Sequence, residues 1–345
     1  MNNPALQPLG SLSPTTRRLP RLGFAGIGWI GRHRLGAIER AGAGRITAVC
    51  DPALANSGPI EGAGLETART TSYEELLAMD LDGVVLATPS ALHAAQAVAA
   101  FERGLAVFCQ KPLGRNAAET RRVVDAACAA DRLLGVDLSY RATAGMRAIR
   151  QLVRDGALGD IYAVELVFHN AYGPDKPWFY DARLSGGGCL LDLGIHLVDL
   201  ALWVLGFPQV THASGQLLAQ GKHWRASAGR VEDYAAGQLV LETGASVQLA
   251  CSWKAPAGCN ARIEANFYGT RGGAVFRNVN GSFYAFTAEY LLPDRSRRTL
   301  AGPPDDWGGR AAVEWAERLA RQPNYQPPIR HIVAVADAID RLYAQ

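Results

Sequence analysis

Short apolar runs alternate with amphipathic segments along the first 140 residues of the chain. The apolar runs predict buried strands, which begin near residue 21 and then cover 45–51, 83–89, 105–109 and 133–137. The segments between them predict helices, among them 92–103 and 116–131. Strands that alternate with helices form a parallel, doubly wound sheet, whose ligands lie outside the carboxyl ends of the strands.

The pattern changes near residue 140. A helix at 144–155 and an alternating strand at 160–169 come first. Strand-like runs then recur about every ten residues, at 209–219, 232–241, 245–253, 261–268, 273–277 and 282–287. Strands without intervening helices predict one large, mostly antiparallel sheet with an open face. Two further helices are predicted near the end of the chain, at 308–321 and 329–343.

A glycine-rich motif, G-x-G-x-x-G, occupies residues 26–31. It follows a predicted strand and opens a predicted helix, and Asp51 ends the second strand twenty residues after the motif. In this context the glycines let a dinucleotide pyrophosphate approach the helix N-terminus. The alternative is a tight turn without a ligand. The residues predicted to form this part of the cofactor site are Gly26, Ile27, Gly28, Trp29, Ile30 and Gly31.

Asp51 decides which nicotinamide cofactor we expect. A carboxylate at this position accepts hydrogen bonds from the ribose hydroxyls and repels an additional phosphate. No arginine follows it directly, because the next residues are Pro52 and Ala53. We therefore expect NAD rather than NADP, although Arg32 or Arg69 could reach a 2′-phosphate.

Polar residues collect where later strands of the first sheet end. Thr88 and Pro89 follow one strand, His93 lies in the next helix, and Gln110 and Lys111 follow another strand. We predict that all five contact the cofactor. A lysine this close to a buried strand of five apolar residues is unusual, and a solvated loop lysine is the alternative for Lys111.

The glycine run 186–188 opens an almost wholly apolar segment that ends at Gly206. It predicts a buried helix, yet Asp192, His196 and Asp199 lie within it on one narrow stripe. Buried carboxylates are costly unless they are paired. One interpretation is a catalytic stripe that the glycines open to a ligand; the other is a structural Asp–His–Asp cluster in a core helix.

Composition excludes several classes of protein. The net charge of +3 is small and scattered, which argues against a nucleic-acid-binding protein. No apolar run is long enough to span a membrane without interruption by charge, proline or glycine. The six cysteines lack C-x-x-C or metal-finger spacing, so we expect buried free thiols, no metal site and a cytoplasmic protein.

The length of 345 residues favours two domains. We assign 21–140 to an N-terminal Rossmann dinucleotide-binding domain of the α/β class. Residues 141–325 are assigned to a substrate-binding and oligomerisation domain of the α+β class, which contains the open-faced sheet. Residues 326–345 form a C-terminal helix that packs back on the chain, and 1–20 form a disordered extension.

Three features occur in a fixed order along the chain. They are the glycine motif with Asp51, the pair Lys111-Pro112 after a buried strand, and the pattern G-G-G-x-x-x-D-x-G-x-H-x-x-D at 186–199. Together they resemble the Gfo/Idh/MocA family of nicotinamide-dependent oxidoreductases. The resemblance covers nearly the whole chain from residue 21 onward.

The resemblance implies catalytic roles for Lys111, Asp192 and His196, which match the lysine of the family's Glu-Lys-Pro motif and the Asp and His of its helix. His196 would take the proton from the substrate. Asp192 would bind the substrate hydroxyl or orient the imidazole, and Lys111 would hold the reacting oxygen. The chain departs from the pattern at Gln110, where glutamate is usual, so less negative charge acts on Lys111.

The implied reaction transfers a hydride between a secondary alcohol of a sugar, cyclic polyol or derivative and NAD. Tyr140, Arg141, His169 and Trp178 are predicted as walls of the substrate pocket, while Asp199 is predicted to be structural. We also expect a homodimer or homotetramer that pairs through the open sheet face, because this face has no covering helices.

Two alternatives to net alcohol oxidation remain open. Some relatives use bound NAD in a redox-neutral cycle, as epimerase-like enzymes and NAD-dependent glycosidases do. Others resemble non-catalytic regulators that sense nicotinamide cofactors. The presence of Lys111, Asp192 and His196 argues against a regulator, because a non-catalytic protein need not keep all three.

Overall fold

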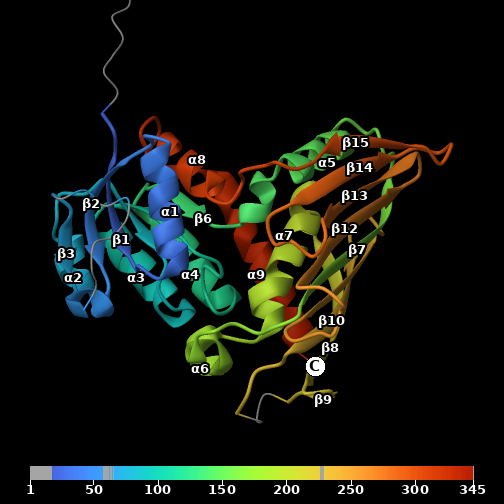
Figure 1. Ribbon diagram of the computed structural model, residues 1–345, viewed down its shortest axis with the longest axis horizontal. Helices are drawn as coiled ribbons and strands as arrows, with labels where there is room; N and C mark the ends of the chain where they lie inside the picture. The colour runs from blue at the N-terminus through green and yellow to red at the C-terminus, as the bar shows by residue number, and fades with distance from the viewer. Residues whose placement is uncertain (1–17, 57–61, 63, 65, 226–228, 345) are drawn as a thin grey trace, which may run out of the picture.

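The computed structural model describes residues 18–344 except 57–61, 63, 65 and 226–228. Two β-sheets lie at opposite sides of the molecule, with helices between them (Figure 1). The extension predicted at 1–20 lies outside the described residues apart from 18–20.

The first sheet has six parallel strands in the order β3-β2-β1-β4-β5-β6, which confirms the predicted doubly wound Rossmann sheet. Its strands are β1 (Arg21–Ala25), β2 (Arg45–Cys50), β3 (Ala68–Thr70), β4 (Gly83–Leu86), β5 (Ala106–Cys109) and β6 (Leu134–Val136). The helices of this part are α1 (Trp29–Arg40), α2 (Tyr73–Leu77), α3 (Ser90–Glu102) and α4 (Ala117–Ala129). β3 and α2 were not predicted, because segments this short carry no clear hydrophobic period.

The second sheet has nine strands in the order β15-β14-β13-β12-β7-β11-β10-β8-β9 and is antiparallel except where β11 pairs with β7, as predicted. Its strands are β7 (Ile161–Asn170), β8 (Val210–Ala219), β9 (Lys222–His223), β10 (Tyr234–Leu241), β11 (Ser246–Ser252), β12 (Ala261–Gly269), β13 (Gly272–Asn278), β14 (Phe286–Leu291) and β15 (Arg297–Ala301). The strand predicted at 282–287 begins only at Phe286, because Asn280 and Gly281 turn the chain with positive φ angles.

Helices α5 (Ala144–Arg154), α7 (Ile195–Val204) and α9 (His331–Tyr343) lie between the two sheets (Figure 1). Helix α8 (Arg310–Leu319) packs instead on the first sheet, where Trp315 meets Phe108 with ring centroids 5.6 Å apart. The remaining helical segments are α6 (Ala182–Ser185) and the 3-10 turns Pro52–Asn56, Ser139–Ala142, Pro177–Tyr180 and Pro327–Arg330. The chain therefore returns to the first sheet after the second is complete; the proposed domain boundaries stay predictions.

The open face of the nine-stranded sheet points away from the helices (Figure 1). Polar pairs lie on its strands, such as Tyr268 with Glu165 at 2.9 Å and Arg262 with Glu264 at 2.9 Å. The expected pairing of two copies through this face stays a prediction.

The apolar segment after the glycine run forms one continuous helix, but its first part is a π-turn at Leu190–Gly194 that leads into α7. The helical stretch Ala182–Val204 is long and apolar enough to cross a membrane by length and composition. Within the described residues, 89% of its most apolar window is buried in the protein. This burial is typical of the core helix of a globular domain.

A buried carboxylate, Glu232, caps the start of this helix. Its side chain accepts hydrogen bonds from the backbone N–H groups of Gly188, at 3.0 Å, and Leu190, at 2.9 Å, and from the hydroxyl of Tyr343, at 2.7 Å. A methyl group on Gly188 would overlap the backbone of Glu232, and one on Gly187 would meet Tyr343. Gly187 and Gly188 are thus required by close contacts with protein atoms at this point.

We predict that Glu232→Ala lowers the free energy of unfolding by about 3 kcal/mol, because it leaves three buried donors without an acceptor. Tyr343→Phe removes only one hydrogen bond and should cost about 1 kcal/mol. Urea denaturation measures both values, with the exposed Glu102→Ala as a control for loss of a carboxylate. Equal stability of Glu232→Ala and Glu102→Ala would show that the cap does not hold the helix.

Candidate active site

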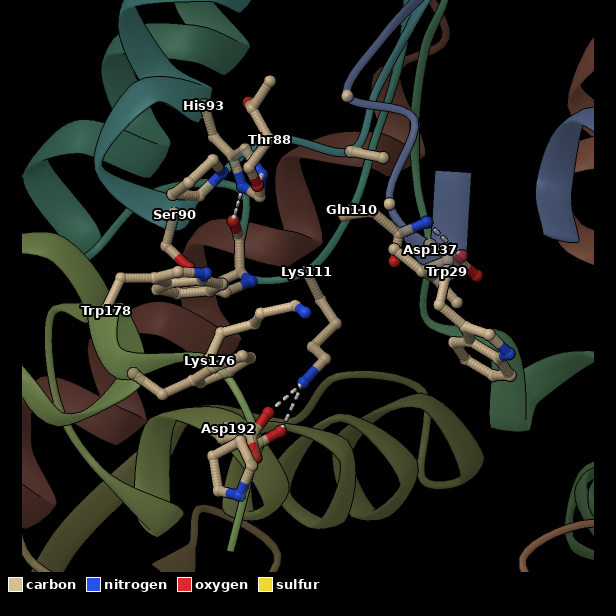
Figure 2. Close-up of a pocket in the computed structure, with 18 of the residues that line it drawn as sticks. Trp29, Thr88, Ser90, His93, Gln110, Lys111, Asp137, Lys176, Trp178 and Asp192 are labelled. Carbon is tan, nitrogen blue, oxygen red and sulfur yellow. Dashed lines mark hydrogen bonds and ion pairs between the residues drawn. The ribbon is translucent and has the colours of Figure 1, made fainter. Parts of the chain in front are cut away.

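A cavity of about 950 Å³ lies between the two sheets and brings together distant parts of the chain. It is lined by the glycine motif, the turns after β4 and β5, the π-turn and the loop between β7 and α6. Figure 2 shows residues from both halves of the molecule pointing into this space. Of the residues predicted to bind the cofactor, all line the cavity except Ile27 and Gly31.

The glycine motif has the geometry that a pyrophosphate group requires. Gly26 has a φ of +90°, and a methyl group there would overlap the Ala87 carbonyl. A methyl on Gly31 would overlap the Gly26 carbonyl, so this glycine keeps α1 close to β1. Gly28, in contrast, has no atom within 4 Å of its Cβ position and faces the cavity. No described side chain caps α1, so its first N–H groups are available to an anion.

Asp51 stands at the end of β2, next to the glycine motif. Its two carboxylate oxygens accept hydrogen bonds from the backbone N–H groups of Ile27, at 2.8 Å, and Ala53, at 2.9 Å. These bonds fix the carboxylate at the mouth of the cavity, where it retains lone pairs for ribose hydroxyls. Arg32 donates to the Ile27 carbonyl at 2.9 Å and is therefore also held beside this loop.

His93 connects the turn after β4 with the turn after β5. The imidazole is 1% exposed, and its two nitrogens lie 2.7 Å from the carbonyl oxygens of Thr88 and Pro112. Burial lowers the pKa of His93, although its two hydrogen bonds raise it. His93 is thus a buried residue of the cavity lining, and it ties the turn after β4 to the turn after β5.

Lys111 and Asp192 form an ion pair across the cavity (Figure 2). The lysine Nζ donates to the carboxylate of Asp192 at 2.6 Å and to its backbone oxygen at 2.7 Å. The other carboxylate oxygen of Asp192 accepts from the indole N–H of Trp253 at 3.0 Å. Lys111 is therefore a partly buried, paired lysine and not a solvated loop residue.

His196 lies one turn further along the same helix and is 7% exposed. Burial holds the pKa of His196 well below its usual range, and the charges of Lys111 and Arg34 lower it further. The imidazole is consequently neutral near pH 7 and can accept a proton. The Tyr140 ring stands edge-on to it, with centroids 5.0 Å apart.

The Asp–His–Asp cluster, which was the structural alternative to a catalytic stripe, does not form in the described part of the chain. Asp192 binds Lys111 and Trp253, whereas Asp199 pairs with the guanidinium of Arg141, and no hydrogen bond links His196 to either carboxylate among the described residues. The π-turn between Asp192 and α7 changes the angular spacing on which the predicted stripe depended.

The four predicted wall residues separate into two groups. Tyr140 and Trp178 line the cavity. Arg141 lies outside it, because it pairs with Asp199 and stacks over Trp203 at 5.8 Å. His169 also lies outside the cavity, where it contacts the Ser252 hydroxyl at 2.8 Å.

Sequence reasoning missed much of the aromatic wall. Phe283, Tyr284 and Trp307 line the cavity from segments beyond β13 and β15, and Tyr284 is 54% exposed. Trp253 was also missed, because its contact with Asp192 joins residues 61 positions apart. No local pattern marks contacts of this range. In the described chain, no group of three or more His, Cys, Asp or Glu residues is arranged to hold a metal ion.

A six-stranded Rossmann sheet with an open glycine motif and an acidic residue at the end of β2 is typical of dinucleotide-binding proteins. Residues 21–138 match the model of an oxidoreductase family with an NAD-binding Rossmann fold. Residues 146–275 match the Gfo/Idh/MocA C-terminal domain. The chain therefore belongs to the Gfo/Idh/MocA family, as the sequence motifs indicated.

Several proteins of known name are similar to this chain. The putative UDP-kanosamine synthase oxidoreductase subunit of Amycolatopsis mediterranei (strain S699) is 34% identical over 255 residues, which are 68% of each chain. The D-glucoside 3-dehydrogenase of Escherichia coli (strain K12) is 28% identical, over 72% of this chain and 76% of the relative. The levoglucosan dehydrogenase structure with NADH and levoglucosan has a TM-score of 0.79, covers 94% of this chain and 96% of its own, and at 20% identity shows a common fold.

We predict opposite effects for two glycine substitutions in the motif. Gly28→Ala should keep the melting temperature, because Gly28 has an extended backbone that alanine adopts and its Cβ position is open. Its methyl group should nevertheless weaken NADH binding at least about tenfold, because it enters the space for the pyrophosphate.

Gly26→Ala should instead destabilise the fold by about 2 kcal/mol, because of its positive φ and the overlap with Ala87. Thermal unfolding and titration with NADH separate the two effects. Wild-type affinity for NADH in Gly28→Ala would contradict this assignment of the motif.

Proposed function

We propose that this protein is a dehydrogenase that oxidises a secondary alcohol of a sugar, cyclic polyol or derivative with NAD. The observation that carries the proposal is the placement of a neutral, buried His196 beside the Lys111–Asp192 pair, in the same cavity as the open glycine motif. A base, a cation and a dinucleotide loop are the parts that alcohol oxidation requires.

His196, Lys111 and Asp192 each have a separate role in this reaction. A bound nicotinamide would supply the acceptor for the hydride that leaves the carbon bearing the hydroxyl. His196 takes the hydroxyl proton, since its imidazole is neutral near pH 7. Lys111 donates to the substrate oxygen and stabilises the negative charge that develops there, by roughly 2–4 kcal/mol. Asp192 fixes the ammonium of Lys111 in place and is itself oriented by Trp253.

Aromatic side chains on the substrate side support a sugar or polyol ring as the ligand. Tyr172 and Phe283 are in contact, with ring centroids 5.9 Å apart, and Tyr284 and Trp307 continue the same wall. Such faces bind the apolar C–H surface of a ring, while the polar groups opposite fix its hydroxyls. Relatives named for action on a glucoside and on inositol agree with this class of substrate.

We predict that His196→Ala and Lys111→Ala lower kcat by about 10²–10⁴-fold, because each removes a group that acts on the reacting oxygen. His196→Ala should keep the wild-type melting temperature, whereas Lys111→Ala leaves the carboxylate of Asp192 without its cation and should lower it. Both variants should keep most of the affinity for NADH. A panel of cyclic polyols and methyl glycosides with NAD, followed by NADH absorbance, measures the rate. The exposed His223→Ala is the matched control.

Two results would contradict this proposal. Near wild-type turnover by a folded His196→Ala variant would exclude His196 as the base. Substrate turnover without accumulation of NADH would favour the redox-neutral cycle of an epimerase-like enzyme or a glycosidase.

We further predict a preference for NAD over NADP in kcat/KM of at least about tenfold, because the Asp51 carboxylate repels a 2′-phosphate. Asp51→Ser should reduce this preference by weakening NAD and admitting NADP. Arg32 lies next to the same loop and provides the opposing charge. A wild-type preference for NADP would show that Arg32 outweighs Asp51.

A further inference from the structure

Gln110 stands where the family usually has glutamate, and its amide group is held from behind by a buried carboxylate. Its Nε2 donates to Asp137 at 2.6 Å, and the same carboxylate oxygen accepts from Arg34 at 2.5 Å. Asp137 is 1% exposed and Arg34 is 5% exposed. Residue 110 therefore need not carry a negative charge itself, because Asp137 already places one in contact with it.

This contact fixes which way the Gln110 amide points. A carboxylate that pairs with a guanidinium is an acceptor only, so the NH₂ of Gln110 must face Asp137. The carbonyl oxygen, Oε1, is then turned away from Asp137. Gln110 lines the cavity, and no donor among the described residues bonds to its Oε1. This oxygen is also not among the fully buried side-chain atoms that lack a partner, so a ligand can reach it. A ligand group that meets Oε1 must consequently be a hydrogen-bond donor.

The strand order indicates which part of the cofactor reaches this oxygen. Asp51 marks the adenosine ribose at the end of β2, and the open Gly28 marks the pyrophosphate beside β1. The other half of a dinucleotide must then extend over β4 and β5, on the opposite side of β1. Gln110 follows β5, with its backbone N–H still bonded to Leu86 of β4. Lys111, the next residue, points to the substrate side.

We propose that Gln110, oriented by Asp137, accepts a hydrogen bond from the carboxamide NH₂ of the nicotinamide. Gln110 is thus a cofactor-binding residue with a defined atomic role, and Asp137 is a positioning residue that acts through it. This inference rests on the proposed function, because it requires a nicotinamide cofactor in the cavity. It also explains why glutamine is compatible with this position: a glutamate would place two carboxylates in contact.

Equilibrium binding of cofactor analogues tests the proposal without reference to turnover. The probes are NADH, the reduced 3-acetylpyridine analogue, in which a methyl group replaces the NH₂, and the reduced thionicotinamide analogue, which keeps the NH₂. Isothermal titration calorimetry should show that the wild type binds the acetylpyridine analogue about tenfold more weakly than NADH, the effect of one hydrogen bond. The thionicotinamide analogue should bind like NADH.

Gln110→Met has a similar volume and no acceptor, and it leaves the Arg34–Asp137 pair intact. It should weaken NADH binding about tenfold and leave binding of the acetylpyridine analogue unchanged. The variant should therefore no longer discriminate between NADH and this analogue. Asp137→Asn should reduce the discrimination in part, because an asparagine amide does not fix the orientation of Gln110. Gln96→Met is the matched control: Gln96 also lines the cavity, but its Oε1 already accepts from the Thr88 hydroxyl at 2.6 Å. For Gln96→Met, the ratio of the dissociation constant of the acetylpyridine analogue to that of NADH should equal the wild-type ratio.

The outcomes separate the two proposals. Equal affinity of the wild type for NADH and the acetylpyridine analogue would overturn the role of Gln110, as would unchanged discrimination in Gln110→Met. If none of the three dinucleotides binds the wild type, the proposed function fails, and with it the need for a nicotinamide contact.

Discussion

The ion pair between Lys111 and Asp192 is the contact on which the arrangement of the site depends. It joins the turn after β5 in the first sheet to the π-turn that precedes α7, the helix that packs against the second sheet. An ammonium and a carboxylate that are both largely removed from water are costly unless they meet. The two halves of the molecule must therefore close on each other at this point, and closure also brings His196 into the same cavity.

The Asp192 end of this pair is held by a second buried carboxylate. Glu232 binds the N–H groups at the start of the π-turn, and Tyr343 of the last helix donates to Glu232. The C-terminal helix thus contributes to the position of a residue 151 positions earlier in the chain, Asp192, although it contributes no side chain to the cavity lining in the described structure. This chain of contacts explains why the glycine run is needed: larger residues would displace the cap.

The sequence was most informative where function requires a local pattern. The glycine motif with Asp51, the Lys-Pro pair and the Asp and His of the helix are each set by short-range geometry, and the first sheet could be predicted from its buried runs. Trp253, Glu232 and Asp137 could not be found in this way, because they act only through contacts with residues distant in sequence. Arg141 and His169 do not line the cavity for the same reason. Each forms a contact elsewhere with a residue distant in sequence, Arg141 with Asp199 and His169 with Ser252, and the sequence does not show these partners.

Gln110 is uncharged, but it contacts a charged pair. Asp137 places a carboxylate next to position 110, and Arg34 neutralises it, so the pair adds little net charge to the site. Burial lowers the pKa of His196, and the charges of Lys111 and Arg34 lower it further. Burial and these two cations together therefore keep the imidazole neutral, which is the form that accepts a proton. Removing Arg34 would weaken this effect and release Asp137 as an unpaired buried charge, so the residues that orient Gln110 and those that set the protonation state of His196 belong to one electrostatic system.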